Sequence, residues 1–202
     1  MTPLKSPFIL LILICSFLVI SCSDERQINP EVEAISLEAD ITRFDLRFAA
    51  ASESDLPQLK AEFPSLFPQQ YPDEFWRAKK QDTLLQALNK EVNAKSPDFT
   101  GYQEEITLLF KHAKYYFPNF EPPKVYTVIS EVDYKDPILM LGSEMIIGLD
   151  NYLGAEHPFY QGIPLYISAQ MKPSQILPDV ASIVARAYIP PARDRSFLGQ
   201  MV

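Results

Sequence analysis

The stretch KVYTVISEVDYKDPILMLGSEMIIGLD, residues 124–150, carries the clearest pattern of β-strands in the chain. Its first apolar run, 125–129, is rich in β-branched residues, and two further apolar segments follow on either side of Gly142. β-Branched and aromatic residues bounded by turn-forming residues are typical of strands. We therefore expect a small β-sheet or hairpin within about residues 124–150.

The segments outward from this stretch favour helices. Apolar residues recur there every three or four positions, as on one face of a helix. The alternation between Ile35 and Ile41 instead predicts one more short strand. The predicted helices span about residues 43–51, 56–63, 72–95 (expected to be the longest), 102–117, 165–171 and 173–189. The fold class is therefore α+β: a mostly helical single domain with a small sheet.

The N-terminus reads FILLILICSFLVISCSD over residues 8–24, an apolar run preceded by Lys5. This pattern is typical of a secretory signal peptide, and the run is short for a membrane-spanning helix. The ending VISC favours a lipoprotein signal over residues 1–21, with Cys22 acylated as the mature N-terminus. Cleavage by an ordinary signal peptidase and an uncleaved anchor helix stay open as alternatives. Residues 22–33 then form the acylated N-terminus and a polar tether, and 34–202 the folded domain.

Charge and cysteine content exclude several classes of function. The chain of 202 residues has a net charge of −8 and an isoelectric point near 4.8. Nucleic-acid binding depends on neutralising phosphates, so an acidic chain is a poor candidate for it. The two cysteines are Cys15, inside the signal peptide, and Cys22. The mature domain should therefore hold no disulfide and no thiolate metal site.

Long composite segments resemble the family of the gliding-motility lipoprotein GldB. They are ITRFDLRFAA (41–50), FPSLFP (63–68), YPDEFWRAKKQDTLLQAL (71–88), LFKHAKYYFPNFEPPKV (109–125), SEVDY (130–134), IIGLDNYLGAEHPFYQGIPLYI (146–167), ILPDVA (176–181) and IPPARDRSFLGQM (189–201). The resemblance implies an envelope lipoprotein required for gliding and linked to type IX secretion, with no catalytic residue to carry over. Family members look longer, and the predicted helix starting at Asp194 has no stop signal. We therefore expect a chain that is incomplete at its C-terminus.

A search for catalytic or metal-binding residues finds no recognisable motif. The helix patterns also distantly resemble a zincin metallopeptidase, but the segment 173–189 lacks the histidines of H-E-x-x-H. The two histidines, His112 and His157, have no ligand spacing, so we expect no metal and no cofactor. A calcium site near Asp150 lacks the alternating oxygen ligands of a calcium loop. The cluster of Arg193, Asp194 and Arg195 could cap the final helix or bind a partner.

Together these patterns predict a non-enzymatic envelope lipoprotein that acts in gliding through protein contacts. Its partners would be the membrane, through the lipid anchor, and other gliding or secretion proteins. We expect an outer-membrane anchor facing the periplasm, although anchoring at the cell surface or inner membrane stays open. A divergent or degenerate zincin-like metallopeptidase is the alternative from another class. A periplasmic ligand-binding module is a third, and an exposed apolar pocket would support it.

Overall fold

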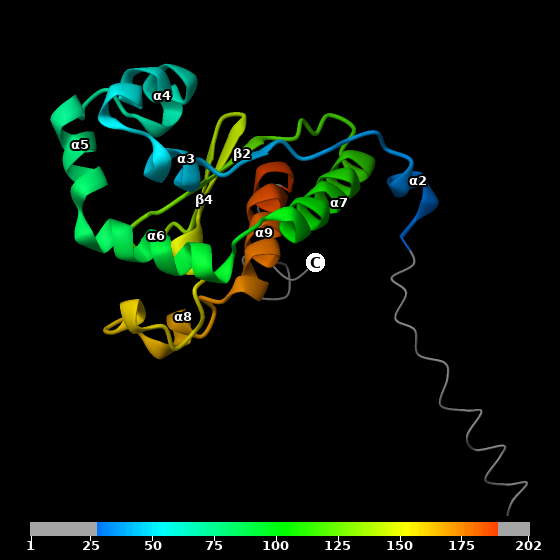
Figure 1. Ribbon diagram of the computed structural model, residues 1–202. Helices are drawn as coiled ribbons and strands as arrows, with labels where there is room; N and C mark the ends of the chain where they lie inside the picture. Colours follow the sequence, from blue (N-terminus) through cyan, green and yellow to red (C-terminus); the bar gives the residue numbers. More distant parts are fainter. Residues whose placement is uncertain (1–27, 190–202) are drawn as a thin grey trace, which may run out of the picture.

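The computed structural model describes residues 28–189, which fold around a four-stranded mixed sheet (Figure 1). The order is β1-β2-β4-β3, with β1, β2 and β4 parallel and β3 antiparallel to β4. The strands are β1 (Ile41–Thr42), β2 (Lys124–Val128), β3 (Ile138–Leu141) and β4 (Glu144–Gly148). The α+β class is confirmed, and strands form within the segment 124–150 as the sequence predicts.

The hairpin between β3 and β4 closes on a two-residue turn. Leu141 pairs with Glu144, so the turn consists of Gly142 and Ser143. Gly142 has a φ of 60°, in the left-handed region that glycine enters without steric penalty. This glycine is the reason that the two apolar segments form separate strands rather than one.

Helices cover both faces of the sheet. They are α2 (Pro30–Glu33), α3 (Phe44–Ala50), α4 (Leu56–Glu62), α5 (Asp73–Gln81), α6 (Thr83–Lys95), α7 (Thr100–Tyr116), α8 (Leu165–Ser168) and α9 (Ile176–Tyr188). Figure 1 shows α3, α4 and α5 gathered on one side of the molecule, and α7 and α9 away from them. Helix α3 contacts β2, whereas α9 contacts β3 and α7.

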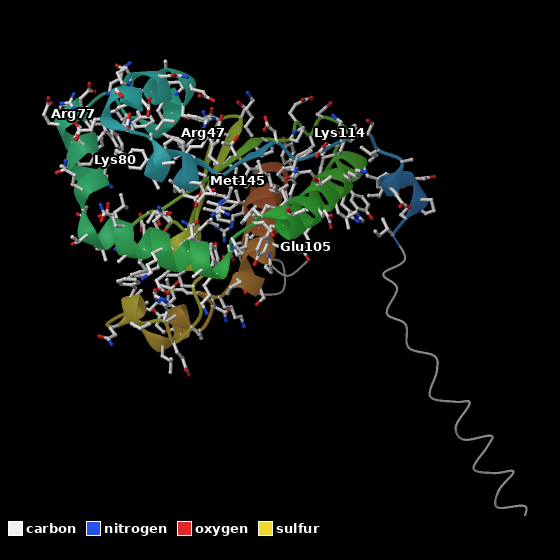
Figure 2. All side chains as sticks on the ribbon, viewed as in Figure 1. Arg47, Arg77, Lys80, Glu105, Lys114 and Met145 are labelled. Carbon is white, nitrogen blue, oxygen red and sulfur yellow. The ribbon has the colours of Figure 1, made fainter. Side chains whose placement is uncertain are left out.

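Two hydrophobic clusters form the core, one on each face of the sheet. Val125 belongs to the larger cluster, together with side chains of α6, α7 and α9, and its neighbour Tyr126 belongs to the smaller one. Successive residues of a strand point to opposite faces, so this split places the clusters on the two sides of β2. Met145 of β4 is fully buried in the larger cluster (Figure 2). The smaller cluster is aromatic, with Phe44 packed edge-to-face on Phe63 and Phe67.

Three predicted elements differ from the structure. Of the strand predicted between Ile35 and Ile41, the structure forms only the two-residue strand β1. Before β1, the N–H of Ala39 donates to the Thr107 side chain at 3.0 Å rather than to a neighbouring strand. The helix predicted over 72–95 is two helices. Asp82 adopts an extended backbone between them, and its carboxylate accepts from the N–H groups of Leu84 (2.7 Å) and Leu85 (3.2 Å).

Aspartate is among the best residues for such an N-cap, which explains why the chain breaks at Asp82 rather than continuing. The longest described helix is consequently α7, not the segment starting at Pro72. The helix predicted over 165–171 is also shorter, because α8 ends at Ser168. The signal peptide and the final helix predicted from Asp194 lie outside the described residues.

Candidate functional site

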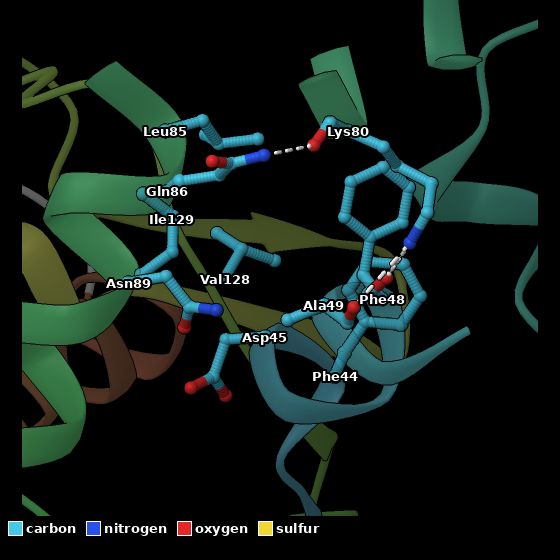
Figure 3. Close-up of a pocket in the computed structure, with 10 residues that line it drawn as sticks. All are labelled: Phe44, Asp45, Phe48, Ala49, Lys80, Leu85, Gln86, Asn89, Val128 and Ile129. Carbon is cyan, nitrogen blue, oxygen red and sulfur yellow. Dashed lines mark hydrogen bonds between the residues drawn. The ribbon is translucent and has the colours of Figure 1, made fainter. Parts of the chain in front are cut away.

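A pocket of about 310 Å³ opens where β2 ends, between α3 and α6 (Figure 3). It has the size of a small-molecule site, a few hundred cubic ångströms. Its walls are mainly apolar and come from α3, α6 and the end of β2, with a few polar side chains among them. The lining residues are Phe44, Asp45, Phe48, Ala49, Lys80, Leu85, Gln86, Asn89, Val128 and Ile129.

Asp45 contributes a negative charge to one wall of the pocket, and Arg43 neutralises it. The Asp45 side chain has no exposed surface, and Arg43 donates to both its oxygens, from Nε at 2.9 Å and from Nη2 at 2.7 Å. Thr127 Oγ1 donates to the same carboxylate. Arg43 also donates to the Ser96 carbonyl at 2.9 Å, beyond the end of α6. This bidentate pair therefore joins α3 to β2 and α6 and leaves no free charge on Asp45.

Lys80 brings the other charge to the pocket. Its ammonium donates to the carbonyls of Phe48 and Ala49 at the end of α3, and it lies 5.0 Å from the centre of the Phe48 ring. Burial lowers the pKa of Lys80 from its ordinary value. The ammonium is thus held against an apolar wall by neutral acceptors.

Two amide side chains of α6 complete the polar part of the lining. Gln86 donates to the Lys80 carbonyl at 2.9 Å, which leaves its own oxygen available as an acceptor. Asn89 accepts from Asn93 at 3.4 Å, which leaves its amide N–H groups available as donors. Figure 3 shows the Gln86 amide next to the Lys80 carbonyl and the Asn89 amide away from Lys80, near Asp45.

The loop after β2, residues 130–132, has a strained backbone next to the pocket. Glu131 and Val132 have φ values of 59° and 60°, a conformation that is an outlier for a β-branched residue. The buried Asp150 carboxylate holds this loop by accepting from the N–H (2.8 Å) and hydroxyl (3.1 Å) of Ser130 and from the N–H of Val132. Burial raises the pKa of Asp150, and these donors offset part of that rise. Lys79 ion-pairs with Glu131, which ties the loop to α5.

Gly148 makes the close approach between this loop and β4 possible. A Cβ at this position would lie 2.5 Å from Ser130 Oγ and 2.9 Å from Asn151 Nδ2. Its φ of −78° is ordinary, so space alone requires glycine there. The strained loop thus depends on both Asp150 and Gly148.

The change Gly148→Ala should therefore destabilise the fold by about 1–3 kcal/mol, as overpacking in a well-packed interior does. The matched control is Gly101→Ala at the start of α7, where an added Cβ meets nothing within 4 Å. That change should stabilise by roughly 0.4–1 kcal/mol through the unfolded chain. Thermal unfolding of the two variants gives the comparison. Equal effects would contradict the close approach at Gly148.

The structure places few of the site residues that the sequence suggested. Cys22 and the cluster Arg193, Asp194 and Arg195 lie outside the described residues. His157 lies in a loop, where it accepts from the N–H of Phe159 at 3.4 Å. His112 lies on α7 with its ring 6.5 Å from Tyr116. Within residues 28–189, no group of three His, Cys, Asp or Glu side chains could hold a metal ion.

Comparison with known protein families decides the identity of the chain. The family model of the gliding motility protein GldB matches residues 25–202. The chain belongs to the GldB family. It is accordingly a gliding-motility-associated lipoprotein of the cell envelope. No curated protein and no solved structure matches it.

The GldB family assignment agrees with the resemblance found in the sequence. Among the residues that the structure describes, no helix is long and apolar enough to cross a membrane. The pocket was not found from the sequence, although one signal was available. Asp45 stands between two apolar residues of the short helix α3, and a charge beside Phe44 on an inward face needs a partner.

Proposed function

We propose that this GldB-family chain is an acylated envelope protein required for bacterial gliding, and that it acts through contacts with the gliding and type IX secretion machinery rather than through catalysis. The observation that carries the proposal is the family match, which covers residues 25–202. Supporting it, α9 carries no histidine where the zincin-like alternative would need metal ligands. Stoichiometric zinc together with peptidase turnover in the full-length protein would overturn this proposal.

The proposed anchor is a set of acyl chains on Cys22, with the outer membrane, facing the periplasm, as its location. Each buried methylene contributes about 0.8 kcal/mol, and stable anchoring needs two chains or an equivalent second signal. A diacylglyceryl group meets that requirement without a spanning helix. The tether is shorter than the sequence suggested, because α2 packs against α7 and buries Val32, so the polar residues 23–29 would hold the domain away from the bilayer.

Protein contacts are tested by crosslinking in intact cells followed by pull-down of the full-length protein. We expect defined gliding or secretion proteins to be captured, and deletion of the gene to abolish colony spreading. Capture of no envelope protein, together with normal spreading and secretion in the deletion strain, would exclude the proposal.

Acylation is tested separately by growing cells with labelled palmitate. The change Cys22→Ala should remove all label from the protein, because the acylated thiol is gone. The matched control is Cys15→Ala, which removes the other cysteine of the chain and should leave labelling intact. Label that persists in Cys22→Ala would show that another residue carries the lipid.

A further inference from the structure

We propose that the pocket between α3 and α6 binds a small amphipathic carboxylic acid, with its apolar body against Phe44, Phe48 and Ile129 and its carboxylate on Lys80. This proposal concerns a ligand of the domain and is independent of the protein partners proposed above. It rests on the size of the pocket, the neutralisation of Asp45 and the environment of Lys80.

The apolar part of the pocket selects the body of the ligand. Six of the ten lining side chains are apolar: Phe44, Phe48, Ala49, Leu85, Val128 and Ile129. They face one another from α3, α6 and the end of β2 (Figure 3). A cavity of about 310 Å³ with such walls favours a short aliphatic or aromatic group that leaves water on entry.

The charges of the lining select the head group. Asp45 and Lys80 are its two charged residues, and Asp45 is fully engaged by Arg43 and Thr127. A cationic ligand would therefore find no free carboxylate there. Among residues 28–189, in contrast, no carboxylate lies within ion-pair distance of the Lys80 ammonium.

The Lys80 ammonium is held by carbonyl oxygens and an aromatic ring, and the Asp55 carboxylate attracts it only from beyond ion-pair distance. A ligand carboxylate would form a charge-assisted hydrogen bond with it, which is about twice as strong as a neutral one. Its lowered pKa agrees with a cation that lacks full solvation.

Trp76 provides a direct readout, since it is the one tryptophan of the chain and its ring lies 6.4 Å from that of Phe48. The probe is octanoate, added to the full chain reconstituted in phosphatidylcholine vesicles. We expect a saturable change in Trp76 emission. Octanamide and octylammonium, which keep the apolar body and lose the negative charge, should bind about tenfold more weakly or not at all.

Three variants locate the binding. Lys80→Met should weaken octanoate binding about tenfold, whereas the matched control Lys90→Met, which removes an exposed ammonium from α6, should leave it unchanged. Ala49→Phe should abolish binding by filling the cavity from its rim. The thermal unfolding of each variant shows that it is folded. Absence of a saturable signal, equal binding of octanamide, or full binding by Lys80→Met would overturn the proposal.

Discussion

Replacing Arg43 by methionine should destabilise the protein by about 3–5 kcal/mol. The change removes the bidentate partner of Asp45, whose side chain is fully buried, and leaves Thr127 as its remaining donor. An uncompensated buried charge is strongly unfavourable, because its desolvation is no longer offset. Urea unfolding followed by circular dichroism measures the change in the free energy of unfolding.

Two comparisons separate this effect from a general loss of charge. Arg47→Met removes an exposed pair, in which Arg47 and Glu62 are 44% and 42% exposed, and should change stability by under about 1 kcal/mol. The double change Arg43→Met with Asp45→Leu removes both charges and should recover most of the loss. A double variant as unstable as Arg43→Met would show that the packing of the arginine, rather than the unpaired carboxylate, is responsible.

The sequence predicted those features that depend on neighbouring residues. The strands within 124–150 and the turn at Gly142 follow from local composition, as does the stop of α7 before Pro118. The split at Asp82 was also encoded locally, as an N-cap residue, but the apolar positions on either side continue one periodic pattern. A prediction based on periodicity alone therefore treated α5 and α6 as one helix.

The candidate site, in contrast, depends on residues far apart in the chain. Arg43 reaches Ser96, and Lys80 reaches the end of α3. Asp150, just after β4, reaches Ser130 and Val132 in the loop after the neighbouring strand β2. Such contacts leave no spacing pattern, so from the sequence Asp150 was considered only for a calcium site that its neighbours do not support. Only the fold shows that Asp150 is fully buried and that its carboxylate holds the strained loop.

The change Asp150→Asn should destabilise the protein by about 2–4 kcal/mol, through the loop rather than the core. Asp150 uses both oxygens to accept, from Ser130 at one and from the N–H of Val132 at the other. Asparagine has one acceptor, so its amide nitrogen must face an N–H donor. That donor is left unsatisfied beside two residues that already hold unfavourable backbone angles.

Amide hydrogen exchange distinguishes this loop effect from global unfolding. In Asp150→Asn, the N–H groups of Ser130 and Val132 should lose protection while those of α7 keep theirs, because the loop can open without the larger core cluster. The matched control is Asp136→Asn, an exposed carboxylate in the connection from this loop to β3, which should stay within about 0.5 kcal/mol of the unchanged protein. Equal loss of protection in α7 would mean that Asp150 supports the whole sheet. Unchanged stability would mean that the loop keeps its conformation without the carboxylate, and its strain would then have to be stabilised by the ion pair of Glu131 with Lys79.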